Sequence, residues 1–79
     1  MSHIILDFRL NYGRNETAQL LDTLRRISEG DTLTIIADRR NAHELGRFYE
    51  ILAHEGFDYR PRGGHNGELS IVARRRQQM

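Results

Sequence analysis

The chain has 79 residues, of which 38% are hydrophobic and 29% charged, as expected for a single domain spanning residues 1–79. It contains no cysteine, which excludes thiolate nucleophiles, persulfide carriage and cysteine-ligated zinc or iron–sulfur sites. All twelve basic residues are arginines, and eleven acidic residues reduce the net charge to +1, so total charge selects no class of partner. No apolar run approaches the roughly 20 residues that cross a bilayer, and we expect a cytoplasmic protein without a membrane partner.

The first predicted elements are a strand and a helix. Apolar and β-branched residues over 3–8 predict a buried strand. Asn15 offers the side-chain acceptor of an N-cap and Gly30 closes the segment, which predicts a helix over 16–29. The apolar stripe of this helix repeats at i, i+4 and i+7 and is formed by Leu20, Leu24 and Ile27.

A second strand and a second helix follow. Residues 32–37 begin with alternation and end as an apolar run, which is typical of a central strand covered by helices. Asn41 and Glu44 have the spacing of a capping box, and Gly56 stands at the position after a C-cap. These signals predict a helix over 42–55, whose apolar stripe is formed by Leu45, Phe48, Tyr49 and Leu52.

The remaining alternation predicts a β-hairpin. Phe57 with Tyr59 and Leu69 with Ile71 form two alternating runs around a glycine-rich loop at 63–67. The element order is therefore βαβαββ, and a right-handed crossover makes the first two strands parallel, with both helices on one face. We expect an α/β (α+β) two-layer sandwich with a mixed four-stranded sheet, and a basic tail at 74–79 that frays.

The whole chain resembles the TusA/SirA-like sulfur-carrier family of small βαβαββ proteins. The resemblance is carried by Leu6-Asp7 at the end of the first strand, by residues 30–38 through the second strand, and by Phe48 with Ala53-His54-Glu55-Gly56 in and after the second helix. When the segment from Leu6 to Gly30 is aligned without gaps, the family's Cys-Pro motif falls on Gly13-Arg14.

The loss of that cysteine changes what the resemblance implies. A helix N-terminus stabilises a thiolate, which suits persulfide transfer, but Gly13 has no side chain. The resemblance therefore implies the family's fold without its sulfur-relay chemistry, and the chain is similar to uncharacterised cysteine-free relatives. We expect no enzymatic activity.

The candidate binding site lies where the first two strands end. Ligand crevices of parallel α/β units form beyond the carboxyl ends of strands, where helix N-termini also point. If the third strand is parallel to the second, the hairpin tip reaches the same edge. Clustered arginines would then make a positive site for phosphate, carboxylate or an acidic protein surface. The predicted site residues are Tyr12, Gly13, Arg14, Asn15, Asp38, Arg39, Arg40, Arg62 and His65.

Simpler interpretations exist for several of these residues. The arginines could be solvated loop residues paired locally with Asp38 or Glu68. The glycines at 63–67 fit a hairpin better than a phosphate-binding loop, because no helix follows them. His43 and His54 are eleven residues apart, or about 16 Å along one helix, and cannot bind a single ion. We predict no metal and no cofactor.

The sequence therefore predicts a non-catalytic binding or regulatory module for a small anion or a protein partner, with Arg39 and Arg40 in the binding site. One alternative is a single-stranded RNA or DNA binder, in which Tyr12 stacks on a base beside Arg14. A second alternative is a sulfur-transfer protein or accessory subunit. A purely oligomer-forming role, through the free edge of the first or third strand, is also open.

Overall fold

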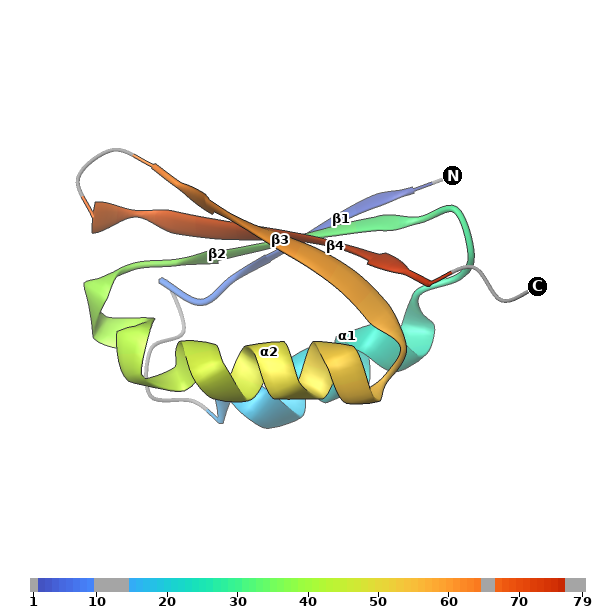
Figure 1. Ribbon diagram of the computed structural model, residues 1–79, viewed down its shortest axis with the longest axis horizontal. Helices are drawn as coiled ribbons and strands as arrows, with labels where there is room; N and C mark the ends of the chain where they lie inside the picture. The colour runs from blue at the N-terminus through green and yellow to red at the C-terminus, as the bar shows by residue number, and fades with distance from the viewer. Residues whose placement is uncertain (1, 10–14, 65–66, 77–79) are drawn as a thin grey trace.

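The computed structural model describes residues 2–9, 15–64 and 67–76. Both helices lie against one face of a four-stranded sheet, so the molecule has two layers (Figure 1). This confirms the predicted α/β sandwich with a mixed sheet. The elements are β1 (His3–Asp7), α1 (Glu16–Arg26), β2 (Thr32–Ala37), the 3₁₀ helix η1 (Arg39–Glu44), α2 (Leu45–His54), β3 (Phe57–Gly63) and β4 (Leu69–Arg75).

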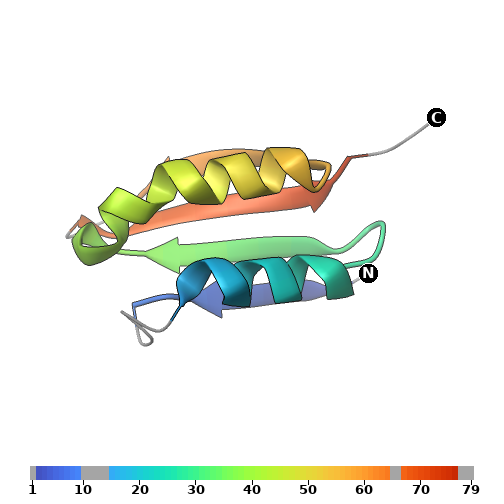
Figure 2. The same ribbon diagram turned by 90° about the horizontal axis from the view of Figure 1, so that it is seen from below.

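The sheet has the strand order β1-β2-β4-β3. β1 is parallel to β2, whereas β4 is antiparallel to both of its neighbours. β3 therefore runs in the same direction as β1 and β2, as the predicted site requires. The end of β3 and the start of β4 lie at the sheet edge where β1 and β2 end (Figure 2).

Alternation along the strands separates a helix-covered face from an open face. In β2, Leu33, Ile35 and Ala37 are fully buried, and the residues between them are only partly buried. The Phe8 and Phe48 rings stack with centroids 5.1 Å apart, which joins the end of β1 to α2. The rest of the buried core is formed by Leu20, Leu24, Ile27, Leu52, Phe57, Ile71 and Ala73.

α1 begins as predicted but ends earlier. The Asn15 side chain accepts a hydrogen bond from the Ala18 backbone N–H at 3.4 Å, in the left-handed conformation that asparagine tolerates (φ 45°). The helix ends at Arg26, because Ile27 is already extended and packs into the core. The prediction of a helix to residue 29 was therefore wrong at its C-terminal end.

The predicted start of the second helix was also wrong. Asp38, not Asn41, is the N-cap: its carboxylate accepts from the Arg40 N–H at 2.9 Å, and Asn41 Oδ1 accepts from the Asp38 N–H at 3.0 Å. This reciprocal pair begins η1, and α2 starts only at Leu45. Asn41 thus has the third-position role in the capping box that the sequence analysis gave to Glu44.

The basic tail was predicted to fray from residue 74, but Arg74 and Arg75 belong to β4. Arg76 is held as well, because its N–H donates to the Gly56 carbonyl at 2.7 Å and its guanidinium pairs with Asp58 at 3.0 Å. Cross-strand pairing with β3 orders this part of the chain. Residues 77–79 lie outside the described residues.

Candidate functional site

The structure places only part of the predicted edge site. Tyr12, Gly13, Arg14 and His65 lie outside the described residues. Of the remaining five, Asn15 is the N-cap of α1, and Asp38, Arg39 and Arg40 follow β2, at the edge where β1 ends. Arg62 lies on β3, opposite Ser70 of β4.

The charge of Arg40 is compensated within the fold. Its Nη2 lies 3.0 Å from Asp38 Oδ2 and also donates to the Arg9 carbonyl at 2.9 Å. The Arg40 guanidinium, together with the Arg40 N–H, lowers the pKa of the Asp38 carboxyl. The simpler interpretation, in which Asp38 pairs locally with an arginine, is thus what the structure shows at this position.

A residue that the sequence analysis passed over, Arg9, crosses the same edge. Its guanidinium bridges Asp7 at 2.8 Å and Glu68 at 2.6 Å, which ties the end of β1 to the start of β4. The hydrogen bond from Arg9 lowers the pKa of the Asp7 carboxyl. Glu68 does pair with an arginine, but with one that is 59 positions away in the chain.

At the described part of this edge, most of the charged side chains are therefore paired with one another. Arg39 is exposed and extends over Gly67, where an added Cβ would lie 2.7 Å from the Arg39 Nε. Gly67 also has a φ of 78°, a conformation that favours glycine, and the Arg39 side chain would have to shift to admit a larger residue. Of the described arginines that follow β1 and β2, Arg39 alone makes no ion pair with a described residue, so a group of exposed arginines without such pairs must be sought elsewhere in the described structure.

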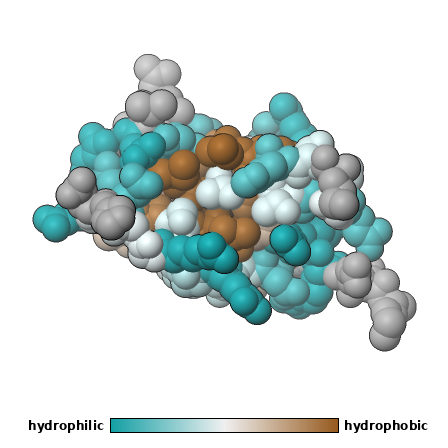
Figure 3. Space-filling model, turned by 90° about the horizontal axis from the view of Figure 1, so that it is seen from above, coloured by the Kyte–Doolittle hydropathy of each residue, from teal (hydrophilic) through white to brown (hydrophobic). Residues whose placement is uncertain are grey.

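Exposed arginines without ion pairs to described residues lie on the side of the sheet that no helix covers, which we call the open face. Figure 3 shows this side, with apolar side chains in its middle and hydrophilic ones around them. Strand register aligns its side chains in three rows that each cross all four strands. The rows are His3-Thr32-Arg74-Asp58, Ile5-Thr34-Val72-Arg60 and Asp7-Ile36-Ser70-Arg62.

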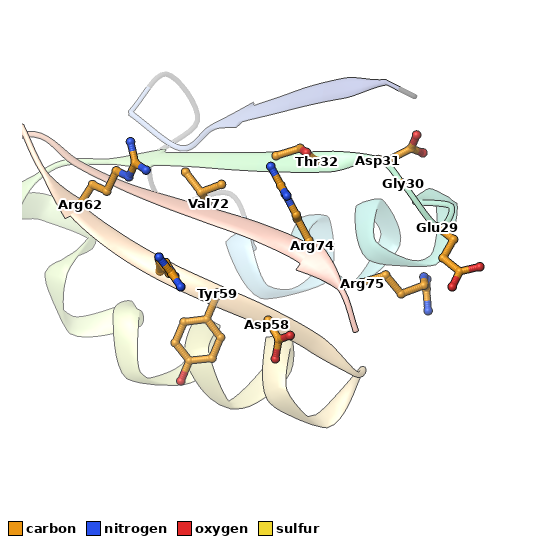
Figure 4. A pocket seen from close by; sticks show the side chains of 11 residues that line it. Glu29, Gly30, Asp31, Thr32, Asp58, Tyr59, Arg62, Val72, Arg74 and Arg75 are labelled. Carbon is orange, nitrogen blue, oxygen red and sulfur yellow. The ribbon is translucent and has the colours of Figure 1, made fainter. Parts of the chain in front are cut away.

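Three arginines of the open face, Arg60, Arg62 and Arg74, are exposed and make no ion pair with any described residue. The side chains of Arg62 and Arg74 extend from the sheet with Val72 between them (Figure 4). They border a depression of about 760 Å³ that reaches the α1–β2 turn. Its lining residues are Glu29, Gly30, Asp31, Thr32, Asp58, Tyr59, Arg60, Arg62, Val72, Arg74 and Arg75.

Most of the acidic residues around the depression already have an ion-pair or hydrogen-bond partner. Asp58 pairs with Arg76. Asp31 accepts hydrogen bonds from the Ser28 and Ser2 backbone N–H groups at 3.0 and 2.9 Å, and these lower the pKa of its carboxyl. Glu29 alone among the lining carboxylates has no such partner in the described structure. The three free arginines therefore give this region an excess of uncompensated positive charge.

Sequence reasoning named Arg62 but not Arg60, and it assigned Arg74 to the tail. A signal for Arg60 was present, because Asp58, Arg60 and Arg62 alternate with Phe57 and Tyr59 along one strand. Alternation places these three polar residues on the face opposite the core. What the sequence does not encode locally is which arginines find carboxylate partners.

The described residues contain no group of three or more His, Asp or Glu side chains placed to hold a metal ion. His43 and His54, predicted on one helix, lie in η1 and α2, and each is near the glutamate that follows it, at 3.4 and 3.2 Å. Within the described part of the chain, no helix is both long enough and apolar enough for a membrane crossing.

Comparison with known proteins adds no assignment. No protein-family model matches the chain, and no curated protein or solved structure is significantly similar to it. The resemblance to the TusA/SirA-like family stays a prediction from the sequence.

Proposed function

We propose that this chain is a non-catalytic binding module that takes an acidic, extended segment of a partner protein on its open face. The observation that supports this most strongly is the group of three exposed arginines, Arg60, Arg62 and Arg74, without ion-pair partners among the described residues. Guanidinium groups bind carboxylates through paired, charge-assisted hydrogen bonds. At the edge where β1 and β2 end, Arg9 and Arg40 already have such partners.

The groups on the open face favour binding over catalysis. Arginine stays protonated at physiological pH and cannot act as a general base. His3 Nε2 does lie 2.8 Å from Thr34 Oγ1, but the pair is exposed, and no described residue hydrogen-bonds the other ring nitrogen of His3. A histidine base in a catalytic pair is normally oriented by such a third group.

The spacing of the arginines fits an extended peptide. Arg60 and Arg62 are two residues apart on β3, so their Cα atoms are separated by about 6.8 Å. Carboxylates at alternate positions of an extended segment repeat at the same distance. The partly exposed Ile36 and Val72, in the middle of the open face, would contact apolar side chains of the same segment.

The alternative of a single-stranded nucleic acid has less support on this face. Such ligands are held by stacking of bases on aromatic side chains as well as by positive charge. No described aromatic side chain belongs to the three rows of the open face, since Tyr59, which borders the depression, lies in the alternate, core-side set of β3 residues. The described rings are buried in the core or, for Tyr49 and Tyr59, stacked on each other with centroids 4.9 Å apart.

The proposal can be tested with the intact chain and a labelled polyglutamate peptide. Fluorescence anisotropy measures affinity, and ¹⁵N NMR titration identifies the residues that respond. We expect the largest shifts along β3 and β4. Arg60→Ala with Arg62→Ala should weaken binding about tenfold or more, because two charge-assisted contacts are lost.

The matched control removes the same charge from the helical side of the molecule. Arg25→Ala with Arg47→Ala alters two exposed arginines that make no ion pair with a described residue. This variant should bind as the parent does. If both double variants weaken binding equally, affinity depends only on net charge, and the proposal is overturned. A mixed single-stranded DNA oligonucleotide that binds more tightly than polyglutamate, with the same arginine dependence, would favour the nucleic-acid function instead.

A further inference from the structure

No described strand pairs with the outer backbone edge of β1, and the orientation of this edge is fixed by the contacts of β1 with β2. The Phe8 N–H donates to the Ile36 carbonyl at 2.8 Å, and the Ser2 carbonyl accepts from the Thr32 N–H at 2.9 Å. Even-numbered residues of β1 therefore direct their backbone groups toward β2. Because the N–H and C=O of alternate residues point to opposite sides of a strand, His3, Ile5 and Asp7 direct theirs away from the sheet.

The other edge strand, β3, is blocked by a proline. The Gly64 N–H donates to the Glu68 carbonyl and the Gly56 carbonyl accepts from the Arg76 N–H, so even-numbered residues of β3 face β4. Pro61 is odd-numbered and lies in the middle of the strand, at a position whose N–H would point outward. Since proline has no N–H, it interrupts the outer edge without disturbing the pairing with β4. β1 has no such protection.

We propose that two copies of this chain pair antiparallel through β1 and form one continuous eight-stranded sheet around a two-fold axis at Ile5. In this register Ile5 lies opposite Ile5 of the second copy, and His3 lies opposite Asp7. All three outward-facing residues are then in hydrogen-bonded pairs, each of which exchanges two backbone hydrogen bonds. A shift by two residues in either direction leaves only two such pairs.

Side-chain chemistry agrees with the register that the backbone selects. The pairing places the exposed Ile5 side chain, with 61% of its surface accessible, against the same residue of the second copy on the open face. It also places an imidazole beside a carboxylate at each end of the strand pair. The interface is self-complementary, as a two-fold interface must be.

The outer edge of β1 carries no other described strand, because β1 is the outermost strand beside β2. Both helices lie on the face opposite the open face (Figure 2), and the two-fold axis puts the helices of the second copy on that same face. Arg60 and Arg62 lie on β3, at the far edge of the sheet, so the pairing does not cover them. The inference is therefore independent of the proposed function, and either can fail without the other.

Because the chain has no cysteine, single introduced cysteines report directly on the two-fold axis. In the proposed register the two Ile5 Cα atoms are about 5.5 Å apart, within the range of a disulfide. The two His3 residues are four positions out of register, and their Cα atoms are about 14 Å apart. Under mild oxidation Ile5→Cys should form a covalent dimer, and the matched control His3→Cys should stay a single chain.

Sedimentation of the unmodified protein supplies a second measurement. We expect a species at twice the 9.3 kDa chain mass, in exchange with the monomer. Ile5→Pro should abolish it by copying the natural protection of Pro61, while Val72→Lys, in the middle of the open face, should leave it unchanged. A parent chain that stays monomeric at millimolar concentration, equal crosslinking of both cysteine variants, or dissociation by Val72→Lys would each overturn the pairing.

Discussion

The Arg75 guanidinium on β4 reaches the last turn of α1 and donates from Nη2 to the Leu24 carbonyl at 3.0 Å. Its Nε donates to the Ile27 carbonyl at 3.1 Å, and the group lies 4.9 Å from the centre of the Phe57 ring. The last carbonyls of a helix have no partner within the helix, and a cation at this end also meets the negative pole of the helix dipole. One side chain from β4 thus supplies hydrogen-bond donors to carbonyls at the C-terminal end of α1.

Removing this side chain should destabilise the whole fold. Arg75→Ala removes a donor from the Ile27 carbonyl and one of the two donors of the Leu24 carbonyl, which keeps the Ile27 N–H, and it takes a cation from the Phe57 ring. We therefore expect the free energy of unfolding to fall by about 1–3 kcal/mol. Urea denaturation monitored by circular dichroism measures the change. Arg74→Ala is the matched control, because Arg74 is the exposed neighbour of Arg75 and makes no ion pair with a described residue. This substitution should change the free energy of unfolding by no more than about 0.5 kcal/mol.

Stability should fall in acid because three aspartates have a lowered pKa in the fold. Asp7 and Asp38 are hydrogen-bonded by arginine, and Asp31 by two backbone N–H groups. A carboxyl whose pKa is lower in the folded than in the unfolded state contributes stability above its unfolded pKa of about 4, and this is lost as pH falls through the folded pKa. The melting temperature should therefore be constant near neutral pH and decline below about pH 4.

Asp31→Asn should flatten that decline, because Asp31 connects Ser2 and Ser28 through its charged form. Asp22→Asn alters an exposed carboxylate paired with Arg26 on the surface of α1, and it serves as the comparison. A pH profile that is equally altered by both substitutions would show that the Asp31 hydrogen bonds do not set the acid response.

Asn41 should be sensitive to truncation for a reason that its sequence position does not reveal. It is fully buried, its Oδ1 accepts from the Asp38 N–H, and its Nδ2 has no hydrogen-bond partner in the described structure. Asn41→Ala removes half of the capping box and leaves the Asp38 N–H unpaired, so we expect a loss of about 1–2 kcal/mol in chemical denaturation. Ala42→Ser, at the exposed neighbour, should have little effect.

The sequence predicts those features of the fold that depend on local pattern. Alternation and apolar runs give the bounds of β2 without error, and the βαβ rule gives the parallel pairing of β1 with β2. The errors occur where a residue distant in the sequence determines the local structure or the ion pairing. The carbonyls at the end of α1 are bound by Arg75, which is about 50 positions away in the chain. The charge of Arg9, at the edge where β1 and β2 end, is balanced in part by Glu68, which is 59 positions away.

The same distinction explains the candidate site. Clustering of arginines at one edge follows from topology, and topology is readable from the order of elements. Whether an arginine is free depends on which carboxylates the fold brings near it. Here Arg40 is paired with Asp38, while Arg60 has no ion-pair partner among the residues that the structure describes. The proposed location therefore moves from the edge to the open face, and Arg62 is shared by both.

A direct comparison of the two locations uses the arginines that the sequence analysis favoured. Arg39→Ala with Arg40→Ala should leave polyglutamate affinity within about twofold of the parent, because Arg40 is engaged by Asp38 and the Arg9 carbonyl. Arg60→Ala with Arg62→Ala should weaken it about tenfold or more. Both pairs remove the same charge, so anisotropy at one salt concentration compares them directly. If the Arg39/Arg40 variant loses binding and the Arg60/Arg62 variant keeps it, the ligand binds at the edge where β1 and β2 end.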